Sequence, residues 1–518
     1  MSKLFRNKEA MNGEVRIPVW LPFLLLFSSL FFLMKKIVAK RRRRSNQLPP
    51  GPPKLPIIGN LHQLGSLPHR SLQQLSKKYG PVMLLQLGSV PTLVVSSAKT
   101  AQQVLKTYDL ECCSRPLLAA TGRLSYSYLD VAFTPYGNYW KEMRKICLLE
   151  LLSVKRVQSF RFIREEEVAL MIDSISQSSS SGNPVNLSHK SMSLNMEVIC
   201  RVAFGNSFRD GGLDVYKFEG LVQEAFSIMG SFSASDFFPR VGWIIDRITG
   251  MHGRLERIFH DLDLFYQEVI DDHLSSERHK QEKDEDIIDV LLKIKKNQAD
   301  SSAFQITHDH IKAILMNIFF AGVETGAAVV GWAMVELARN PRVMKKAQEE
   351  IRNYVGEKGK ISESDIDQLQ YLKLVVKEAL RFHPPGAFLI PRESRSQFTI
   401  NGYNVYPKTR IYVNIWAIGR DPESWENPGQ FYPERFIDSP LDYKGHHFEF
   451  LPFGAGRRGC PGMNMGMFMV ELALANLLYH FDWKLPNGLK EEDLNMEEAA
   501  GLSNHVKQAL VLVPTKYQ

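Results

Sequence analysis

The sequence predicts a mainly α-helical protein with small β-sheets, built as one large domain behind an N-terminal transmembrane anchor. Three observations support this fold class. Residues 17–34 form a stretch without a single charge. Most of the chain from about residue 60 to 518 has helical periodicity, with no composition break that would mark a second domain. Residues 309–340 are apolar on nearly every face, which is typical of a helix at the centre of a fold.

The composition narrows the class of protein. Five cysteines in 518 residues argue against a disulfide framework and fit a reducing compartment. The net charge of +8 comes from the N-terminus, because residues 1–44 hold eleven basic and two acidic residues. The remaining chain carries 53 basic and 54 acidic groups, so its composition does not support nucleic-acid binding.

The first element is the candidate anchor, Ile17–Met34. As a helix it would span roughly 27 Å, close to a hydrocarbon core of about 30 Å. The charge is +2 before it and +7 from Lys35 to Arg44, which predicts a cytosolic C-terminal side. We therefore expect a short tail over residues 1–16 and a retained signal-anchor helix over 17–37. A cleaved or purely interfacial segment is the alternative.

Residues 38–60 follow as a basic and proline-rich hinge. Prolines at 49, 50, 52, 53 and 56 hold the backbone extended and stiff. A strut that orients the domain formed by residues 61–518 is the interpretation we prefer. A Pro-x-x-Pro ligand for a partner's aromatic groove is the alternative.

Within the domain, alternating apolar stretches predict a few strands at 81–96 and 398–413, the second with an Asn401-Gly402 turn. Polar segments predict exposed loops at 174–183 and 275–286. In the long central helix, Thr307 can cap the start, and Asn340-Pro341 should end it.

The strongest chemical signal is the glycine-rich segment 452–462, followed by an apolar helical pattern over 463–478. Cys460 is expected at a helix N-terminus beside two arginines, which favours a thiolate. One thiolate in a tight loop suits the single axial bond of a haem iron. A buried structural cysteine is the alternative. Zinc is disfavoured because Cys112, Cys113, Cys147 and Cys200 lack paired ligand spacing and are expected to be inert buried thiols.

The pattern Phe453-x-x-Gly456-x-Arg458-x-Cys460-x-Gly462 resembles the haem-binding loop of the cytochrome P-450 superfamily. Three further motifs agree in the same order, and the resemblance covers essentially the whole chain. It implies the cytochrome P-450 fold, with a single large haem domain. Its cofactor would be haem b (iron protoporphyrin IX), with Cys460 as the axial ligand and with Phe453 and Gly454 in the cofactor-binding loop.

The second motif is Ala321-Gly322-Val323-Glu324-Thr325-Gly326, midway along the central helix. Gly322 would open room for dioxygen, and Glu324 and Thr325 would relay protons as the catalytic pair. The alternative is close helix packing at Gly322 with Thr325 bonded to a carbonyl one turn back. Family members usually carry Thr or Ser where this chain has Gly326.

The third and fourth motifs concern charged residues. Glu378 and Arg381 are i,i+3 neighbours, and the resemblance implies that they form a structural ion-pair lock with Arg435. Trp140 and Arg144 are i,i+4 neighbours that can donate hydrogen bonds to a haem propionate. The resemblance gives Arg392 and Arg458 the same role.

The resemblance implies haem-thiolate mono-oxygenation, with one atom of dioxygen inserted into the substrate. The sequence shows no flavin or nicotinamide fingerprint, so NADPH would act only indirectly, through the membrane-bound NADPH–cytochrome reductase. We expect Lys141 and Lys145 to help dock its acidic face. The implied location is the endoplasmic reticulum membrane, single-pass, with the catalytic domain in the cytosol.

By family analogy, the substrate pocket is lined by a set of mainly apolar residues: Ala321, Gly322, Ala387, Phe388, Leu389, Ile390 and Leu502. This favours a small lipophilic substrate. The chain resembles plant microsomal A-type members of the family seventy-one clan, which implies specialised metabolism of terpenoid or alkaloid type. Residues 237–239 and 243–245 could dip into the bilayer, or they could pack internally.

Two other functions stay open from the sequence. One is a haem-thiolate isomerase or dehydratase that works without external electrons, although relatives of that kind generally lose the threonine at the position of Thr325. The other is a non-catalytic haem sensor or a structural membrane protein, and sensing would not need the Glu324-Thr325 pair.

Overall fold

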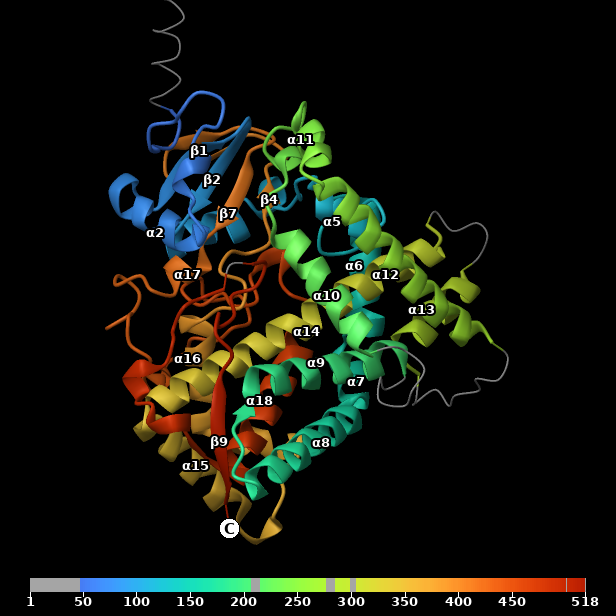
Figure 1. The fold of residues 1–518 in the computed structure, drawn as a ribbon. Helices are drawn as coiled ribbons and strands as arrows, with labels where there is room; N and C mark the ends of the chain where they lie inside the picture. The colour runs from blue at the N-terminus through green and yellow to red at the C-terminus, as the bar shows by residue number, and fades with distance from the viewer. Residues whose placement is uncertain (1–46, 206–214, 276–284, 299–303, 500, 518) are drawn as a thin grey trace, which may run out of the picture.

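A computed structural model describes residues 47–205, 215–275, 285–298, 304–499 and 501–517 (Figure 1). The predicted anchor at 17–37, the tail before it and the first part of the hinge lie outside these residues. Helices dominate, as predicted, and their bounds are α2 (Pro68–Tyr79), α3 (Ala98–Gln102), α4 (Asp109–Cys112), α5 (Ala119–Leu124), α6 (Asn138–Ile146), α7 (Val154–Ser159), α8 (Arg161–Ser180), α9 (Leu187–Phe204), α10 (Val215–Gly230), α11 (Gly242–Ile248), α12 (Met251–Leu274), α13 (Ile287–Asn297), α14 (His308–Arg339), α15 (Pro341–Val355), α16 (Gln370–Phe382), α17 (Ile415–Ile418) and α18 (Met463–His480).

The strands form three small sheets in the described part of the chain. They are β1 (Val82–Leu87), β2 (Val90–Val95), β3 (Val185–Asn186), β4 (Arg392–Glu393), β5 (Phe398–Ile400), β6 (Tyr403–Val405), β7 (Arg410–Val413), β8 (Phe481–Lys484) and β9 (Val511–Lys516). The largest sheet has the order β1-β2-β7-β4, and β2 runs parallel to β7. Both predicted strand regions are confirmed, including the turn, where Asn401 and Gly402 have positive φ.

The central element is α14, which crosses the middle of the molecule in Figure 1 and is buried along most of its length. It begins directly after Thr307 and ends before Asn340, so both predicted boundaries are confirmed. It is long and apolar enough to cross a membrane, but its buried surroundings are those of a core helix. α9 and α18 both pack against α14, and residues of the three helices belong to one hydrophobic core.

One of the two predicted loops is wrong. Residues 174–180 continue α8, and only residues 181–184 leave the helix before β3. In this stretch, serine hydroxyls donate hydrogen bonds to backbone carbonyls one turn back, as Ser178 does to Ser174 O. The other predicted loop falls largely on residues 276–284, outside the described residues.

The last part of the hinge packs along the first strand. The Leu84 N–H donates to Pro50 O at 2.9 Å, and the Asn60 N–H donates to Gln86 O at 2.6 Å. A Cβ on Gly51 would lie 2.2 Å from Leu84 O, so this residue must be glycine for the segment to come so close. The described hinge residues are therefore fixed to the sheet edge.

Candidate functional site

The glycine-rich loop before α18 folds back on itself around Cys460. The Cys460 N–H donates to Phe453 O at 2.9 Å, and Gly454 and Gly456 have φ of 68° and 69°. A Cβ on Gly456 would lie 2.3 Å from Leu105 O, so the loop can approach the π-helical segment Gln103–Thr107 only with glycine at this position. A Cβ on Gly454 would touch Leu389, which brings segment 387–390 next to the loop.

The Cys460 thiol has accessible surface although protein surrounds it. It therefore faces an interior surface rather than the outside of the molecule. Burial raises the pKa of Cys460, while a hydrogen bond from the Gly462 N–H and the charge of Arg144 lower it. Within the protein alone, desolvation of the charged form outweighs this hydrogen bond and this charge. A bound cation would reverse this balance.

The other four cysteines are buried within the helical core, as predicted. Burial raises the pKa of Cys147 to about 12 and also raises those of Cys112, Cys113 and Cys200. These thiols are therefore inert, and Cys460 is the exposed one among the five.

The middle of α14 presents two different faces. Ala321 and Thr325 are exposed side chains, one turn apart, in a helix whose neighbouring positions are mostly buried. Gly322 and Gly326 face α9 instead, where added Cβ atoms would lie 2.4 Å from Ile199 Cδ1 and 2.3 Å from Asn195 Oδ1. The space expected at Gly322 for dioxygen is therefore filled by Ile199, and close helix packing is the correct interpretation of this glycine.

Gly326 is explained by the same contact. Asn195 donates to Ser191 O at 2.8 Å, and its Oδ1 occupies the space that a side chain at 326 would need. The residue that departs from the usual family pattern is thus matched by an amide on α9.

Glu324 and Thr325 differ in their surroundings. Thr325 Oγ1 donates to Ala321 O at 2.6 Å, which is the local bond that the sequence left as an alternative. Its hydroxyl oxygen can still accept a hydrogen bond. Glu324 is buried, and burial raises its pKa, while a hydrogen bond with Ser503 lowers it.

Four arginine side chains gather near the cysteine loop: Arg115, Arg144, Arg392 and Arg458. Burial and the charges of the other arginines lower the pKa of Arg115 and of Arg458, the latter to about 9. Several of their donors reach backbone carbonyls, such as Arg458 to Thr134 O and Arg144 to Gly459 O. A concentration of buried positive charge of this kind fits a ligand with two carboxylates.

Trp140 lies in the same region, and Arg458 covers its ring at 4.0 Å from the centroid. Its Nε1 donates to Val131 O at 3.0 Å. Trp140 and Arg144 both belong to α6, so the helix expected from the sequence brings this pair beside the cysteine loop.

Asp109 is a residue that sequence reasoning missed. It accepts from Arg392 Nη1 at 2.7 Å and from the Arg457 N–H at 3.1 Å, while Arg392 Nη2 donates to Ala455 O at 3.0 Å. Asp109 thus fixes the cysteine loop to the N-terminal part of the domain. No local pattern marks Asp109, because its partners Arg392 and Arg457 are distant in sequence.

The charged residues of α16 form a buried cluster. Glu378 accepts two hydrogen bonds from Arg381, at 2.7 and 2.8 Å, and one from Arg435 at 3.0 Å. It also accepts the Tyr432 N–H at 2.7 Å. Glu378 and Arg381 are almost fully buried, so these bonds hold the segment before the cysteine loop against α16.

Phe388 and Leu389, in segment 387–390, have different surroundings. Leu389 faces Gly454, whereas Phe388 packs against Tyr412, with ring centroids 5.3 Å apart, and against the sheet-side core. The expectation that Phe388 lines the pocket is wrong, because its ring packs against Tyr412 and the sheet-side core. Ile390 and Leu502 are exposed, and the Leu502 backbone lies against Gly230.

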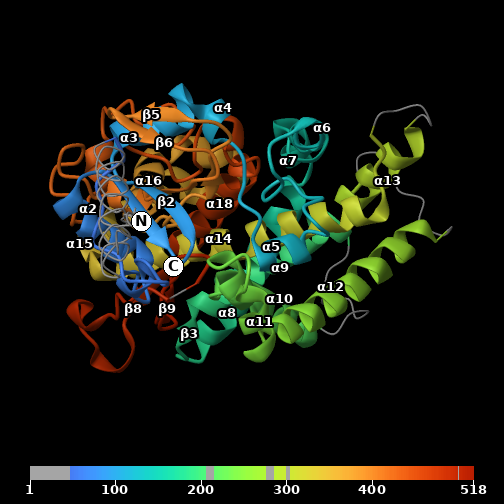
Figure 2. The same cartoon turned by 90° about the horizontal axis from the view of Figure 1, so that it is seen from above.

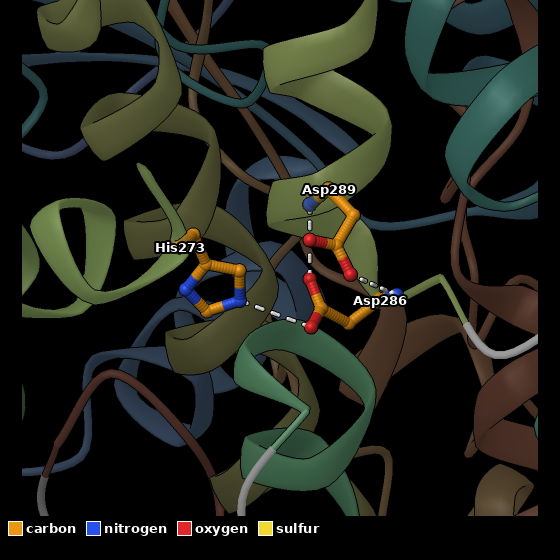
Figure 3. Close-up of side chains that lie close together, drawn as sticks. All are labelled: His273, Asp286 and Asp289. Carbon is orange, nitrogen blue, oxygen red and sulfur yellow. Dashed lines mark hydrogen bonds and ion pairs between the residues drawn. The ribbon is translucent and has the colours of Figure 1, made fainter. Parts of the chain in front are cut away.

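A second group of polar residues, His273, Asp286 and Asp289, joins α12 to α13 (Figure 3). Asp286 and Asp289 accept from each other's N–H groups, at 2.9 and 3.2 Å, in a capping box. His273 Nε2 lies 3.0 Å from Asp286 Oδ2, and its Nδ1 lies 2.6 Å from Val269 O. These bonds fit a structural connection between two helices, and we assign the group no metal.

A single accessible thiol in an interior loop, with arginines gathered at one side, fits a protein that holds haem through cysteine. The sequence profile of the family described as cytochrome P450 matches residues 49–513. The chain belongs to the cytochrome P450 family.

Known proteins agree with this assignment. Cytochrome P450 71B36 of Arabidopsis thaliana is 56% identical over 469 residues, covering 90% of this chain and 93% of the relative. Cytochrome P450 71B37 of the same plant is 55% identical over the same length. A solved structure of a zebrafish cytochrome P450 with abiraterone has a TM-score of 0.72 at 27% identity, covering 87% of this chain and 99% of that one.

These similarities confirm the cytochrome P450 fold, the mono-oxygenase class and the haem b cofactor. Electron supply through a reductase is typical of this family. Dioxygen, a lipophilic substrate and a redox partner follow from the same family membership.

Proposed function

We propose that this protein is a membrane-anchored haem-thiolate mono-oxygenase that inserts one atom of dioxygen into a lipophilic plant specialised metabolite of terpenoid or alkaloid type. Electrons come from NADPH through the NADPH–cytochrome reductase. Residues 17–37 anchor the chain in the endoplasmic reticulum, residues 38–60 form the hinge, and residues 61–518 form the cytosolic catalytic domain. The observation that carries the proposal is the interior exposure of Cys460 in a loop whose Gly454 lies against Leu389.

Cys460 binds the haem iron, and Phe453 and Gly454 shape the loop that presents it. Trp140, Arg144, Arg392 and Arg458 surround the haem propionates, and the arginine charge matches their carboxylates. The bound haem supplies the cleavage of dioxygen and the transfer of one oxygen atom. Glu378, Arg381 and Arg435 keep the backbone behind the loop in place through the buried bonds described above.

Glu324 and Thr325 deliver protons to the interior. Because burial raises the pKa of Glu324, its carboxyl group can hold a proton nearer to neutral pH than an exposed glutamate does. The exposed Thr325 side chain is next to it in sequence, and its hydroxyl oxygen can accept a hydrogen bond. Proton delivery distinguishes a mono-oxygenase from a haem protein that only binds or rearranges its ligand.

The substrate side is apolar. Ala321, Ala387, Leu389, Ile390 and Leu502 supply aliphatic surface, which favours a lipophilic molecule over a charged one. Gly322 and Phe388 are excluded from this list, because their contacts are with α9 and with the sheet.

An exposed apolar surface supports the membrane association. Trp243, Ile244, Ile245 and Ile248 of α11 are 51, 43, 44 and 81% exposed, which argues against internal packing of this helix. Ile57 is 84% exposed, and the Gly88–Ser89 turn joins its segment to Phe237 by hydrogen bonds from Gly88 to Ile58 O and from Ser89 to Phe237 O. Both segments lie at the same end of the molecule in Figure 1. Such a patch fits a bilayer surface.

The reductase would dock on the face that carries α6. Lys141 and Lys145 are exposed on this helix, whose Arg144 reaches the cysteine loop. Positive charge at this place favours encounter with an acidic partner.

The test is a membrane preparation of the full chain with a plant reductase, supplied with NADPH and a plant metabolite extract. Mass spectrometry should detect products that gain one oxygen atom only when reductase and NADPH are both present. Turnover without the reductase would support the isomerase or dehydratase instead. Haem incorporation without any product from a wide extract would favour the sensor.

A further inference from the structure

The buried carboxylate of Glu324 needs a source of protons if it is to deliver them to the interior. Its carboxylate meets the C-terminal segment 503–505. Ser503 is buried and hydrogen-bonds to Glu324, and His505 Nδ1 lies 3.8 Å from Glu324 Oε1. The side chain of His505 is 43% exposed, so one ring connects the buried acid to solvent.

The backbone around these residues is firmly held. Trp332, two turns after Glu324 on α14, donates from Nε1 to Asn504 O at 3.0 Å, and the Asn504 N–H donates to Pro385 O at 2.7 Å. The residues on either side of Asn504 are therefore fixed against the same helix that carries Glu324.

The base of the same segment is held by Glu498. This buried carboxylate accepts from Arg70 Nε at 2.7 Å and from Trp416 Nε1 at 3.0 Å, and it lies 2.7 Å from His69 Nε2. The Ala499 N–H donates to His505 O at 2.9 Å, which ties His505 back to this anchor. The approach of His505 to Glu324 is thus built into the fold rather than left to a free loop end.

The charges around the ring are few. Among the described residues, Glu324 is the one carboxylate within 4 Å of the His505 ring, and the Ser503 hydroxyl lies 3.5 Å from His505 Nδ1. Burial lowers the pKa of His505, while a hydrogen bond with the Ser503 backbone raises it.

Resting on the proposed function, we propose that His505 and Ser503 form the outer part of a proton relay that recharges Glu324 from solvent. In each transfer, the Nδ1–H bond of the protonated His505 ring breaks and an O–H bond forms on the Glu324 carboxylate, directly or through the Ser503 hydroxyl. The neutral ring then takes a proton from water. His505 acts through Glu324, so it is a positioning residue and not a catalytic one.

The first experiment measures the coupling itself and needs no turnover. The full-length holoprotein, labelled at histidine ring carbons and kept as its diamagnetic carbonyl adduct, is titrated by NMR in membrane discs. The resonance of His505 is assigned by its loss in His505→Asn. We expect Glu324→Gln to lower the pKa of His505, because a nearby carboxylate stabilises the imidazolium. An unchanged pKa would overturn the relay.

The second experiment compares product formed per NADPH consumed. His505→Asn keeps a polar side chain of similar reach but cannot transfer protons, so we expect about tenfold less product per NADPH and a larger solvent isotope effect. His446→Asn, an exposed matched control, should leave both unchanged. If His505→Asn behaves like the control while Glu324→Gln is impaired, the relay is wrong although the mono-oxygenase assignment stands. An inactive wild-type protein would instead count against the proposed function, and the NMR titration still decides the relay.

Discussion

Gly322 of α14 lies directly against Ile199 of α9, so that a Cβ on the glycine would stand 2.4 Å from Ile199 Cδ1. One turn later, Gly326 meets Asn195 in the same way. Two glycines thus let α9 approach the central helix, while the exposed Ala321 and Thr325 look in another direction. One side of α14 therefore packs against α9, and another side carries the exposed residues of the candidate site.

This contact predicts the effect of Gly322→Ala. The added methyl group collides with Ile199, and we expect a loss of about 1–3 kcal/mol in the free energy of unfolding. Thermal unfolding of the membrane-extracted protein measures it. Ile199→Ala should recover part of the loss in the double variant, since it removes the colliding atoms. Independent, additive effects of the two changes would contradict this packing.

Replacement of Cys460 tests the thiolate ligand. We expect Cys460→Ala to lose the thiolate-type absorption of the reduced carbonyl adduct, because no other described cysteine is exposed. Cys147→Ala is the matched control, and it should retain the spectrum because that thiol is buried and inert. Retention of the thiolate spectrum in Cys460→Ala would disprove the assignment of the ligand.

The exposed face of α11 predicts contact with lipid. Tryptophan fluorescence of the full chain in vesicles should be quenched by brominated lipids, and Trp243→Phe should remove part of that quenching. Trp425→Phe is the control, since Trp425 is buried in the core. Equal quenching in wild type and Trp243→Phe would show that α11 stays away from the bilayer.

Reversal of the two lysines on α6 tests the docking face. We expect Lys141→Glu with Lys145→Glu to lower the reductase-supported rate about fivefold at low salt and to weaken its salt dependence. The single variants should show smaller effects in the same direction. Lys345→Glu on α15, which lies far from α6 in both Figure 1 and Figure 2, should change neither quantity. An unchanged rate and salt dependence in the double variant would place the docking surface elsewhere.

Glu471 predicts a pH dependence of stability. Burial in α18 raises its pKa from 4.5 to about 7, with Lys373 opposing the shift. The neutral form is therefore favoured in the folded state. The stability that this neutral form contributes is fully present below the pKa of Glu471 in the unfolded chain. It is lost as the pH rises through the pKa of the folded state, and the loss is about 3 kcal/mol at most.

We expect Glu471→Gln to remove this loss, so that the variant gains stability over wild type between about pH 5 and 8 and matches it near pH 4. Melting temperatures across this range measure the difference. Glu349→Gln, at an exposed position on α15, is the control. Parallel curves for wild type and Glu471→Gln would refute the prediction.

Local spacing determined much of what was predicted. The capped central helix, the strand pairs with their Asn401-Gly402 turn and the glycine loop around Cys460 depend on neighbours within a few residues, and all three are present as expected. The loop predicted from the serines at 174–180 was wrong. Serine is typical of loops, but within a helix its hydroxyl can donate to a backbone carbonyl one turn back.

The direction of side chains could be decided only by the tertiary structure. Gly322 and Phe388 sit in motifs that point to the pocket, yet long-range packing turns them toward α9 and the sheet. Asp109 and His505 acquire their roles from partners hundreds of residues away or on another element. The sequence by itself determined which chemistry the chain carries, because short motifs fix the reactive groups and their local geometry. The packing of distant elements decided which of those groups meet, because burial and contact depend on the whole fold.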